Sequence, residues 1–255
     1  HNYQDTDYYT FTTDLPGKLS VTLGDETQSS GYLGWSLFLY NSDREQIGKT
    51  ELTQGTASVT IPEQGFDPGT FYIQVKTNAM TNVNWSGAEQ YTLTADFTPT
   101  DSTYESEPND STSRADVMLP NTPVSGKLSD ESDVDYYKVT LDSAAQFSLC
   151  LEHALPDDLS SSGTPWTVTC YPFDEKTGTL REDKAVTLDA ALGKTKTESE
   201  TVLVRGGTYY VEVRHKGIGG FSDLEYTLTM QAEMLTYTKG DANADGSIDS
   251  TDVFE

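Results

Sequence analysis

Apolar and polar residues alternate in short runs along most of the chain, and glycine, proline, asparagine and serine separate these runs. The pattern is clearest at residues 207–214, where a glycine turn leads into alternating polar and apolar positions. A period of two predicts half-buried β-strands. No stretch shows a sustained helical apolar period, so the pattern predicts an all-β protein.

The strand pattern is repeated once along the chain. Four landmarks recur in the same order, and the two members of each pair lie 128 to 138 residues apart. The pairs are Asp7-Tyr8-Tyr9 with Asp135-Tyr136-Tyr137, the strand from Trp35 with the strand from Trp166, residues 69–76 with 207–214, and residues 91–94 with 226–229. This spacing indicates one domain copied once. Many short strands with turns between them predict two tandem antiparallel β-sandwiches of a jelly-roll-like kind.

Composition suggests where the two copies begin and end. We expect a first lobe at 1–98, a polar linker at 99–106, a second lobe at 107–232, a short linker at 233–239 and a tail at 240–255. The second copy opens with Glu107-Pro108-Asn109-Asp110, then Ala115, Val117 and Leu119. The first copy has no counterpart to this opening segment.

Charge narrows the classes of partner. The chain has 16 basic and 41 acidic side chains, which gives a formal charge of -25. Nucleic acids and anionic membranes demand a basic face, so we expect neither as a partner. No apolar run approaches the ~18 residues of a membrane helix. Because residue 1 is His, we expect a processed or excised piece, and export must be inferred from other features. We also expect a monomer.

Both cysteines, Cys150 and Cys170, fall in the second copy. By alternation Cys170 shares a face with Val168, whereas Cys150 lies opposite Phe147 and Leu149. A disulfide would require the two faces to meet, so the sequence leaves open a bond or two buried thiols.

Motifs that would indicate an enzyme are absent from the sequence. His1, His153 and His215 fall in no catalytic pattern, and neither Gly-x-Ser-x-Gly nor His-Glu-x-x-His occurs. A pair of carboxylates can always be drawn among 41 acids, so glycosidase chemistry gains no support from them. We therefore expect a protein that is not an enzyme.

Carbohydrate binding needs flat aromatic rings beside polar side chains that bind hydroxyls. Trp85 is the strongest candidate because it lies in a polar loop, and Phe221 holds nearly the corresponding place in the second copy. Trp35 and Trp166 occupy equivalent strand starts, where a core role and a platform role are both open. Further candidates are Tyr32, Tyr40 and Tyr171. Tyrosines of the shared motifs, such as Tyr9, Tyr72, Tyr137 and Tyr210, are expected to serve the fold.

The tail has the oxygen spacing of a calcium loop. Asp241, Asn243 and Asp245 fall at positions 1, 3 and 5, Gly246 allows the sharp turn, Ser247 offers its carbonyl and Asp252 closes position 12. Calcium is a hard cation that takes six to eight oxygens, so we expect Ca²⁺ here. The alternative is an acidic disordered tail.

Several motifs of the second copy together resemble the bacterial pre-peptidase C-terminal domain, a small jelly-roll-like sandwich appended to secreted enzymes. They are residues 107–110, 126–128, 133–137, 207–211 and 226–229. The resemblance covers the first copy more loosely. Some members bind insoluble polymers, and members can bind calcium near this opening segment. The resemblance therefore implies a second calcium site at Glu107, Asn109 and Asp110, with Asp133 or Asp135, against the alternative of a capped turn.

The tail resembles the first half of a type I dockerin, a module that attaches proteins to cohesins on extracellular scaffolds. Only one of the two loops of a dockerin lies within the chain, so we expect the fragment itself to bind cohesin poorly. Tandem lobes joined to a dockerin are similar to starch adherence system proteins of amylosomes. This resemblance implies a non-catalytic protein of an extracellular, cell-surface complex that binds starch or maltooligosaccharides. The rival interpretation is a protein-binding or spacer module.

Overall fold

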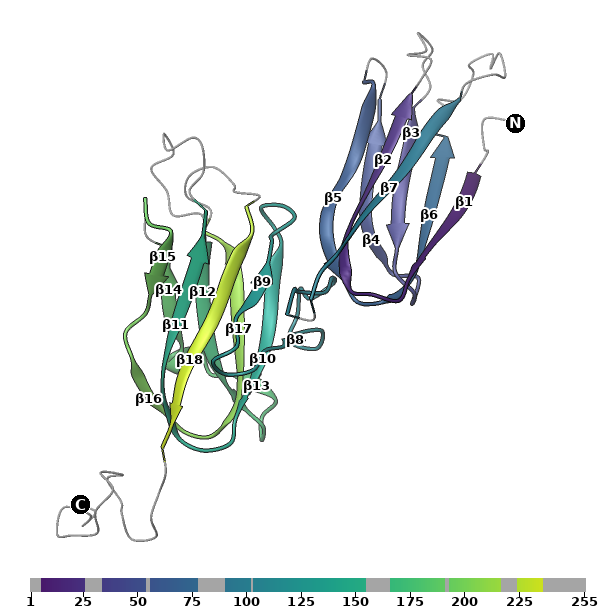
Figure 1. Cartoon of the computed structure of the whole chain (residues 1–255). Helices are drawn as coiled ribbons and strands as arrows, with labels where there is room; N and C mark the ends of the chain where they lie inside the picture. Colours follow the sequence, from purple (N-terminus) through teal and green to yellow (C-terminus); the bar gives the residue numbers. More distant parts are fainter. Residues whose placement is uncertain are drawn as a thin grey trace, which may run out of the picture. The chain divides into compact units, whose positions relative to one another are not determined.

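The computed structural model describes residues 6–25, 34–53, 56–77, 90–101, 103–154, 166–190, 193–216 and 224–235. The chain divides into two compact units, His1–Pro108 and Asn109–Glu255, which are called the first and the second lobe (Figure 1). Of the described residues, 63% lie in β-strands, and a single three-residue 3-10 helix is the one helical element among them. None of the described helices is long and apolar enough to cross a membrane. The expected all-β, antiparallel fold is confirmed.

The first lobe is formed by two antiparallel sheets. One has the strand order β1-β6-β3-β4 and the other has the order β5-β2-β7. The strands are β1 (Thr6–Thr13), β2 (Gly17–Asp25), β3 (Trp35–Tyr40), β4 (Gln46–Leu52), β5 (Ser58–Phe66), β6 (Gly69–Thr77) and β7 (Tyr91–Pro99). Inward residues of both sheets form one core, which includes Leu19, Val21, Leu37, Ile61 and Val75. Burial of one face of each sheet is what the alternating sequence pattern demands.

The second lobe repeats this plan with additional strands. One sheet has the order β13-β12-β17-β10-β8, with β14 also on β12, and the other has the order β15-β11-β18-β9, with β16 also on β11. The strands are β8 (Asp116–Val117), β9 (Val124–Gly126), β10 (Val134–Leu141), β11 (Ala145–His153), β12 (Trp166–Asp174), β13 (Thr179–Leu180), β14 (Val186–Asp189), β15 (Lys196–Glu198), β16 (Val202–Val204), β17 (Gly207–His215) and β18 (Tyr226–Met234). The 3-10 helix is η1 (Glu182–Lys184).

The strand pairings confirm the internal duplication. In the first lobe β1 pairs with β6 and β6 with β3, and in the second β10 pairs with β17 and β17 with β12. Tyr9 lies opposite Ile73, and its counterpart Tyr137 lies opposite Val211. The two copies therefore place their shared motifs at the same positions of the same kind of sheet.

The two cysteines are free thiols, and both are buried. Cys170 belongs to the core of the second lobe, whereas Cys150 alternates away from the core residues Leu149 and Leu151 on β11. Burial raises the pKa of both thiols. The protein therefore has two free thiols and no disulfide between Cys150 and Cys170. Cys170 lies on the core face of its sheet, whereas Cys150 points away from the core.

Candidate functional site

Three tyrosines lie on the outer face of the four-stranded sheet of the first lobe. Tyr8 on β1 is opposite Gln74 on β6, and Tyr40 on β3 is opposite Tyr72 on β6. Alternate residues of β6, such as Ile73, point into the core, so Tyr72 and Gln74 point outward. Three adjacent strands thereby bring three aromatic rings to one surface.

A glutamine amide links two of these rings. Gln74 Nε2 donates a hydrogen bond of 2.5 Å to the hydroxyl of Tyr8, and the hydroxyl of Tyr40 donates one of 3.1 Å to Gln74 Oε1. Arg44 lies over the ring of Tyr72, with its guanidinium carbon 5.6 Å from the ring centroid. These contacts restrict the orientation of the rings before any ligand arrives.

The aromatic surface continues toward β4. Phe38 stacks with Tyr40 at a centroid distance of 6.3 Å and an interplanar angle of 24°, and Lys49 Nζ lies 5.7 Å from the centroid of Phe38. Tyr8 is 68% exposed, while the other three rings are half-buried. The tyrosine face of the first lobe is defined as Tyr8, Phe38, Tyr40, Tyr72 and Gln74.

The second lobe carries an equivalent face with an acid at its centre. Tyr136 on β10 lies opposite Glu212 on β17, and Tyr171 on β12 lies opposite Tyr210 on β17. Tyr136 donates a hydrogen bond of 2.5 Å from its hydroxyl to Glu212 Oε2, and Arg214 Nε lies 3.2 Å from Glu212 Oε1. A neutral amide in one lobe is therefore replaced by a carboxylate in the other.

This second face is more enclosed than the first. Tyr210 is 8% exposed and Glu212 is 7% exposed, and Phe173 packs edge-on against Tyr210 at 5.4 Å. Burial, followed by the hydrogen bond to Glu212, raises the pKa of Tyr136 well above its usual value. Burial is also the main cause of a raised pKa at Tyr171. The first lobe thus offers the more accessible aromatic surface.

Burial separates the aromatic residues that the sequence suggested for carbohydrate binding into core residues and surface residues. Trp35 is 3% exposed and Trp166 is fully buried, so the platform role suggested for them is wrong and both are core residues. Their side chains alternate with outward positions and join apolar core residues such as Leu37 and Val168. Tyr40 and Tyr171 instead lie on the two outer faces. The remaining candidates, Tyr32, Trp85 and Phe221, lie outside the described residues.

Sequence reasoning missed Tyr8, Tyr72 and Gln74, because membership of a shared motif was interpreted as a role in the fold. The alternation of inward and outward residues along β6 would have identified Tyr72 and Gln74 as surface residues. Phe71, Ile73 and Val75 form an apolar series on β6, which assigns the intervening residues to the outer surface.

The opening segment of the second lobe gathers acidic and amide side chains at one side of β10. Asn109 and Asp135 are fully buried, and Asp133 is 7% exposed. The carbonyl oxygen of Asn109 accepts a hydrogen bond of 3.1 Å from the Tyr136 amide, and Asn109 Nδ2 donates one of 3.4 Å to Asp116 Oδ2. The backbone of this segment is thereby held beside β10.

Burial dominates the electrostatics of this cluster. It raises the pKa of Asp133, and the nearby charge of Asp110 acts in the same direction, although the Ser129 amide donates to the Asp133 carboxylate. The Oδ1 atoms of Asn109 and Asp135 are buried and take part in no hydrogen bond, while both residues have other partners. Buried oxygen donors of this kind are the ligands that Ca²⁺ prefers.

Glu107, which the sequence also suggested as a ligand, belongs to the first compact unit. The predicted tail site at Asp241 to Asp252 lies outside the described residues.

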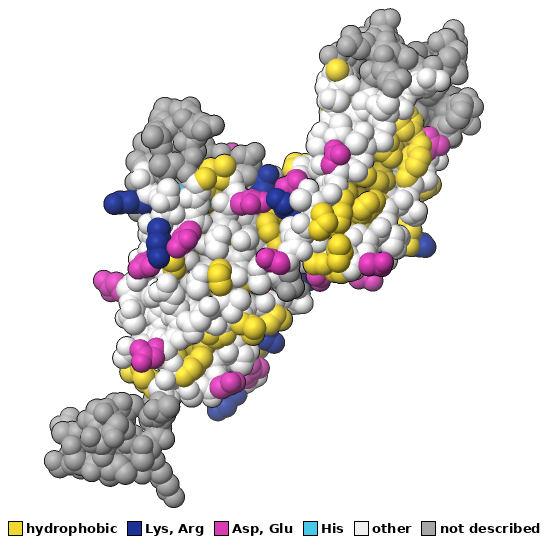
Figure 2. Space-filling model, viewed as in Figure 1, with side chains coloured by type: hydrophobic (Ala, Val, Ile, Leu, Met, Phe, Trp, Pro, Cys, Tyr) yellow, Lys and Arg dark blue, Asp and Glu magenta, His cyan; other side chains and the backbone are white. Residues whose placement is uncertain are grey.

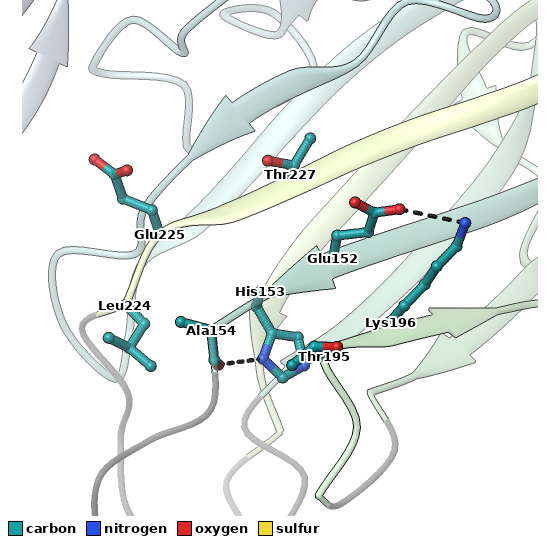
Figure 3. A pocket seen from close by; sticks show the side chains of 8 residues that line it. All are labelled: Glu152, His153, Ala154, Thr195, Lys196, Leu224, Glu225 and Thr227. Carbon is teal, nitrogen blue, oxygen red and sulfur yellow. Dashed lines mark hydrogen bonds and ion pairs between the residues drawn. The ribbon is translucent and has the colours of Figure 1, made fainter.

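A hollow of about 780 Å³ lies at one end of the second lobe (Figure 3). It is lined by Glu152, His153, Ala154, Thr195, Lys196, Leu224, Glu225 and Thr227. Lys196 Nζ lies 3.3 Å from Glu152 Oε1. His153 Nδ1 lies 2.7 Å from the Ala154 carbonyl and so carries the proton of that contact, while its ring packs against Trp166 at 4.5 Å. Among the residues that the structure describes, this lining contains none of the aromatic residues suggested for carbohydrate binding.

Comparison with known proteins gives likenesses at the level of structure. No protein-family model matches the chain, and no curated protein matches its sequence. The chain is similar to the pre-peptidase C-terminal domain of a collagenase from Bacillus anthracis, with 17% identity, a TM-score of 0.35, and coverage of 46% of this chain and 94% of that one. It is also similar to the tandem CBM51 modules of a family 98 glycoside hydrolase from Streptococcus pneumoniae, with 10% identity, a TM-score of 0.25, and coverage of 89% and 81%. Both TM-scores lie below 0.5, so these likenesses carry no inference about what the chain binds.

Proposed function

We propose that the chain is a non-catalytic polysaccharide-binding protein and that the tyrosine faces are its contact surfaces. The observation that carries this proposal is the grouping of the exposed Tyr8 with the half-buried Tyr40 and Tyr72 around the amide of Gln74. Aromatic rings cover the C–H faces of sugars, and an amide between them binds hydroxyls. The antiparallel sheet presents these groups from three adjacent strands as an extended surface, which suits a polymer.

Starch or another α-1,4-glucan is the ligand that we favour. This choice rests on the resemblance of tandem lobes with a dockerin-like tail to starch adherence proteins, with attachment to a cohesin through the complete dockerin of the parent protein. It implies an extracellular location in a cell-surface complex. The faces themselves offer stacking and hydroxyl recognition, which many neutral glucans satisfy.

The proposal is tested by retention of the chain on insoluble starch, cellulose and xylan, with and without a calcium chelator. Retention on starch alone supports the full proposal, and retention on another polymer contradicts the choice of starch. A chain that binds none of the three contradicts polysaccharide binding altogether.

The double variant Tyr8→Ala, Tyr40→Ala tests whether binding belongs to the first lobe, because it should then lose retention. The control is Leu15→Ala, since Leu15 is 56% exposed and lies in the turn after β1.

We further propose that Ca²⁺ binds at the opening segment of the second lobe. The ligands would be Asn109, Asp110, Asp133 and Asp135, together with Glu107. Their oxygens are hard donors, and the burial of three of these residues explains why a cation would be stabilising there, because it compensates carboxylates that are removed from water. The bound ion would offset part of the local negative charge and join the opening segment to β10.

Calorimetric titration with Ca²⁺ separates this site from the one proposed for the tail at Asp241, Asn243, Asp245, Ser247 and Asp252. In the full chain, Asn109→Ala is expected to remove one binding event and Asp245→Ala the other. If Asn109→Ala leaves the stoichiometry and the thermal shift of the native chain unchanged, the site in the second lobe is contradicted.

A further inference from the structure

A row of three polar residues crosses the outer face of the first lobe beside the tyrosine face. Lys76 on β6 lies opposite Ser36 on β3, and Ser36 lies opposite Glu51 on β4. Lys76 follows Gln74 by two positions, so the side chains of both point to the outer surface, roughly 7 Å apart along the strand. The charged row of the first lobe is defined as Lys76, Ser36 and Glu51.

The second lobe carries the same kind of row at the equivalent positions. Arg214 on β17 lies opposite Thr167 on β12, and Thr167 lies opposite Asp189 on β14. The hydroxyl of Thr167 donates a hydrogen bond of 2.9 Å to Asp189 Oδ1. The charged row of the second lobe is defined as Arg214, Thr167 and Asp189. In each lobe a cation, a hydroxyl and a carboxylate therefore lie side by side on three adjacent strands.

An ion pair joins each charged row to the aromatic face of its lobe. In the first lobe Lys49 Nζ lies 2.8 Å from Glu51 Oε1 and 5.7 Å from the ring centroid of Phe38. In the second lobe Arg214 Nε lies 3.2 Å from Oε1 of Glu212, the acid at the centre of the face. Aromatic rings and charged groups thus form one continuous surface in each lobe.

Folding does not explain why the two copies match at this row. The cation and the carboxylate of each row are exposed, and exposed ion pairs contribute only about 0–1 kcal/mol to stability. Neighbouring outward positions have different chemistry in the two copies, since Phe38 corresponds to Thr169 and Lys49 to Thr187. A match at exposed positions with little effect on stability therefore points to contact with a common ligand.

The chemistry of the row suits the hydroxyls of a neutral sugar. A carboxylate accepts hydrogen bonds from hydroxyl groups, and a lysine or arginine donates to hydroxyl oxygens. Each row holds one charge of each sign, so it gives an anionic polymer no net attraction. The formal charge of -25 on the whole chain repels such a polymer further.

We propose that the charged row is a second subsite for the polysaccharide chain that the tyrosine face binds. Glu51 or Asp189 accepts hydrogen bonds from a sugar next to the one stacked on the rings, and Lys76 or Arg214 donates to it. The polymer then runs along the strands, because the rings and the row follow one another along β6 and β17. This subsite rests on the proposed polysaccharide binding and assigns its ligand to the neutral polymers with free hydroxyls.

The test compares the dissociation constants for soluble starch of the native full chain and of the double variant Glu51→Ala, Asp189→Ala. Loss of both acceptors should weaken binding by about fivefold. The matched control is Glu63→Ala, Glu198→Ala, which also removes one ion-paired carboxylate from each lobe but from the opposite sheet. The control should bind as the native chain does.

A native chain that binds starch and a double variant that binds it equally well would overturn the charged row as a subsite, while the tyrosine faces would stand. That result is expected if the charges serve only to keep the edge strands β4 and β14 from pairing with other chains. Equal weakening in the control would also overturn the subsite, because a change in net charge would then explain the effect. A native chain that binds no neutral polysaccharide would overturn both proposals.

Discussion

Tyr9 and Tyr137 occupy equivalent positions on β1 and β10, yet Tyr9 is 42% exposed and Tyr137 is 1% exposed. Each lies opposite an aliphatic residue of the neighbouring strand and within 2.7 Å of a second tyrosine hydroxyl. In the second lobe, residues 109–126 cover this position with a short strand beside β10 and another beside β18. The duplication therefore allows the same pair of tyrosine hydroxyls to be compared in two environments, one exposed at Tyr9 and one buried at Tyr137.

Removal of one hydroxyl from each lobe should have unequal effects on stability. Tyr226→Phe removes the donor to Asp135, which is fully buried, so we expect a loss of about 1–3 kcal/mol in the free energy of unfolding. Tyr91→Phe removes the donor to Asp7, which is half-buried, and should cost less than about 1 kcal/mol because water can replace the donor. Chemical unfolding of both variants checks this, and equal losses would contradict the role assigned to the covering segment.

High pH should destabilise the fold through two half-buried tyrosines. Burial raises the pKa values of Tyr91 and Tyr136 above the ordinary value of about 10. Above that value the unfolded chain loses protons that the native chain retains, so the free energy of unfolding falls as pH rises. Glu212→Gln should lower the pKa of Tyr136, since it removes a carboxylate acceptor. Ultraviolet titration checks this, with Tyr136→Phe to assign the group; an unchanged titration would contradict it.

Trp35 and Trp166 should not report the binding of sugar. Both are core residues, so Trp35→Phe and Trp166→Phe are expected to lower stability and to leave the affinity for polysaccharide unchanged. The measurement is retention on the bound polymer alongside thermal unfolding of each variant. A loss of affinity in a variant that remains folded would restore the platform role that the burial of these residues contradicts.

The two thiols should be unreactive in the native state. Cys150 and Cys170 are buried, and burial raises the pKa of both, so little thiolate is present near neutral pH. Ellman's reagent should detect two thiols after denaturation and almost none before it. Absence of free thiol in the denatured chain would show that they are joined.

Strand periodicity predicted most of this fold because the alternation is strong where one face of a strand is buried. Alternation along β3 places Trp35 on the face of Leu37 and Leu39, which is the core face, and so decides between the two roles that the sequence analysis left open. The strand β4 was not expected, since its residues are half-buried or exposed and show little apolar alternation.

The candidate site was only partly predictable. Tyr40 and Tyr171 were suggested as single residues, but their partners come from other strands, and the registers that join Tyr8, Gln74 and Tyr40 are set by pairing across distant parts of the sequence.

The most direct test of polysaccharide binding is the dissociation constant for soluble starch of the native chain and of Tyr8→Ala, measured by affinity electrophoresis or calorimetry. Tyr8 is the most exposed ring of the tyrosine face, and its loss should weaken binding by about fivefold, or roughly 1 kcal/mol. Leu15→Ala should bind as the native chain does. Equal dissociation constants for all three proteins would contradict the tyrosine face as the contact surface for starch.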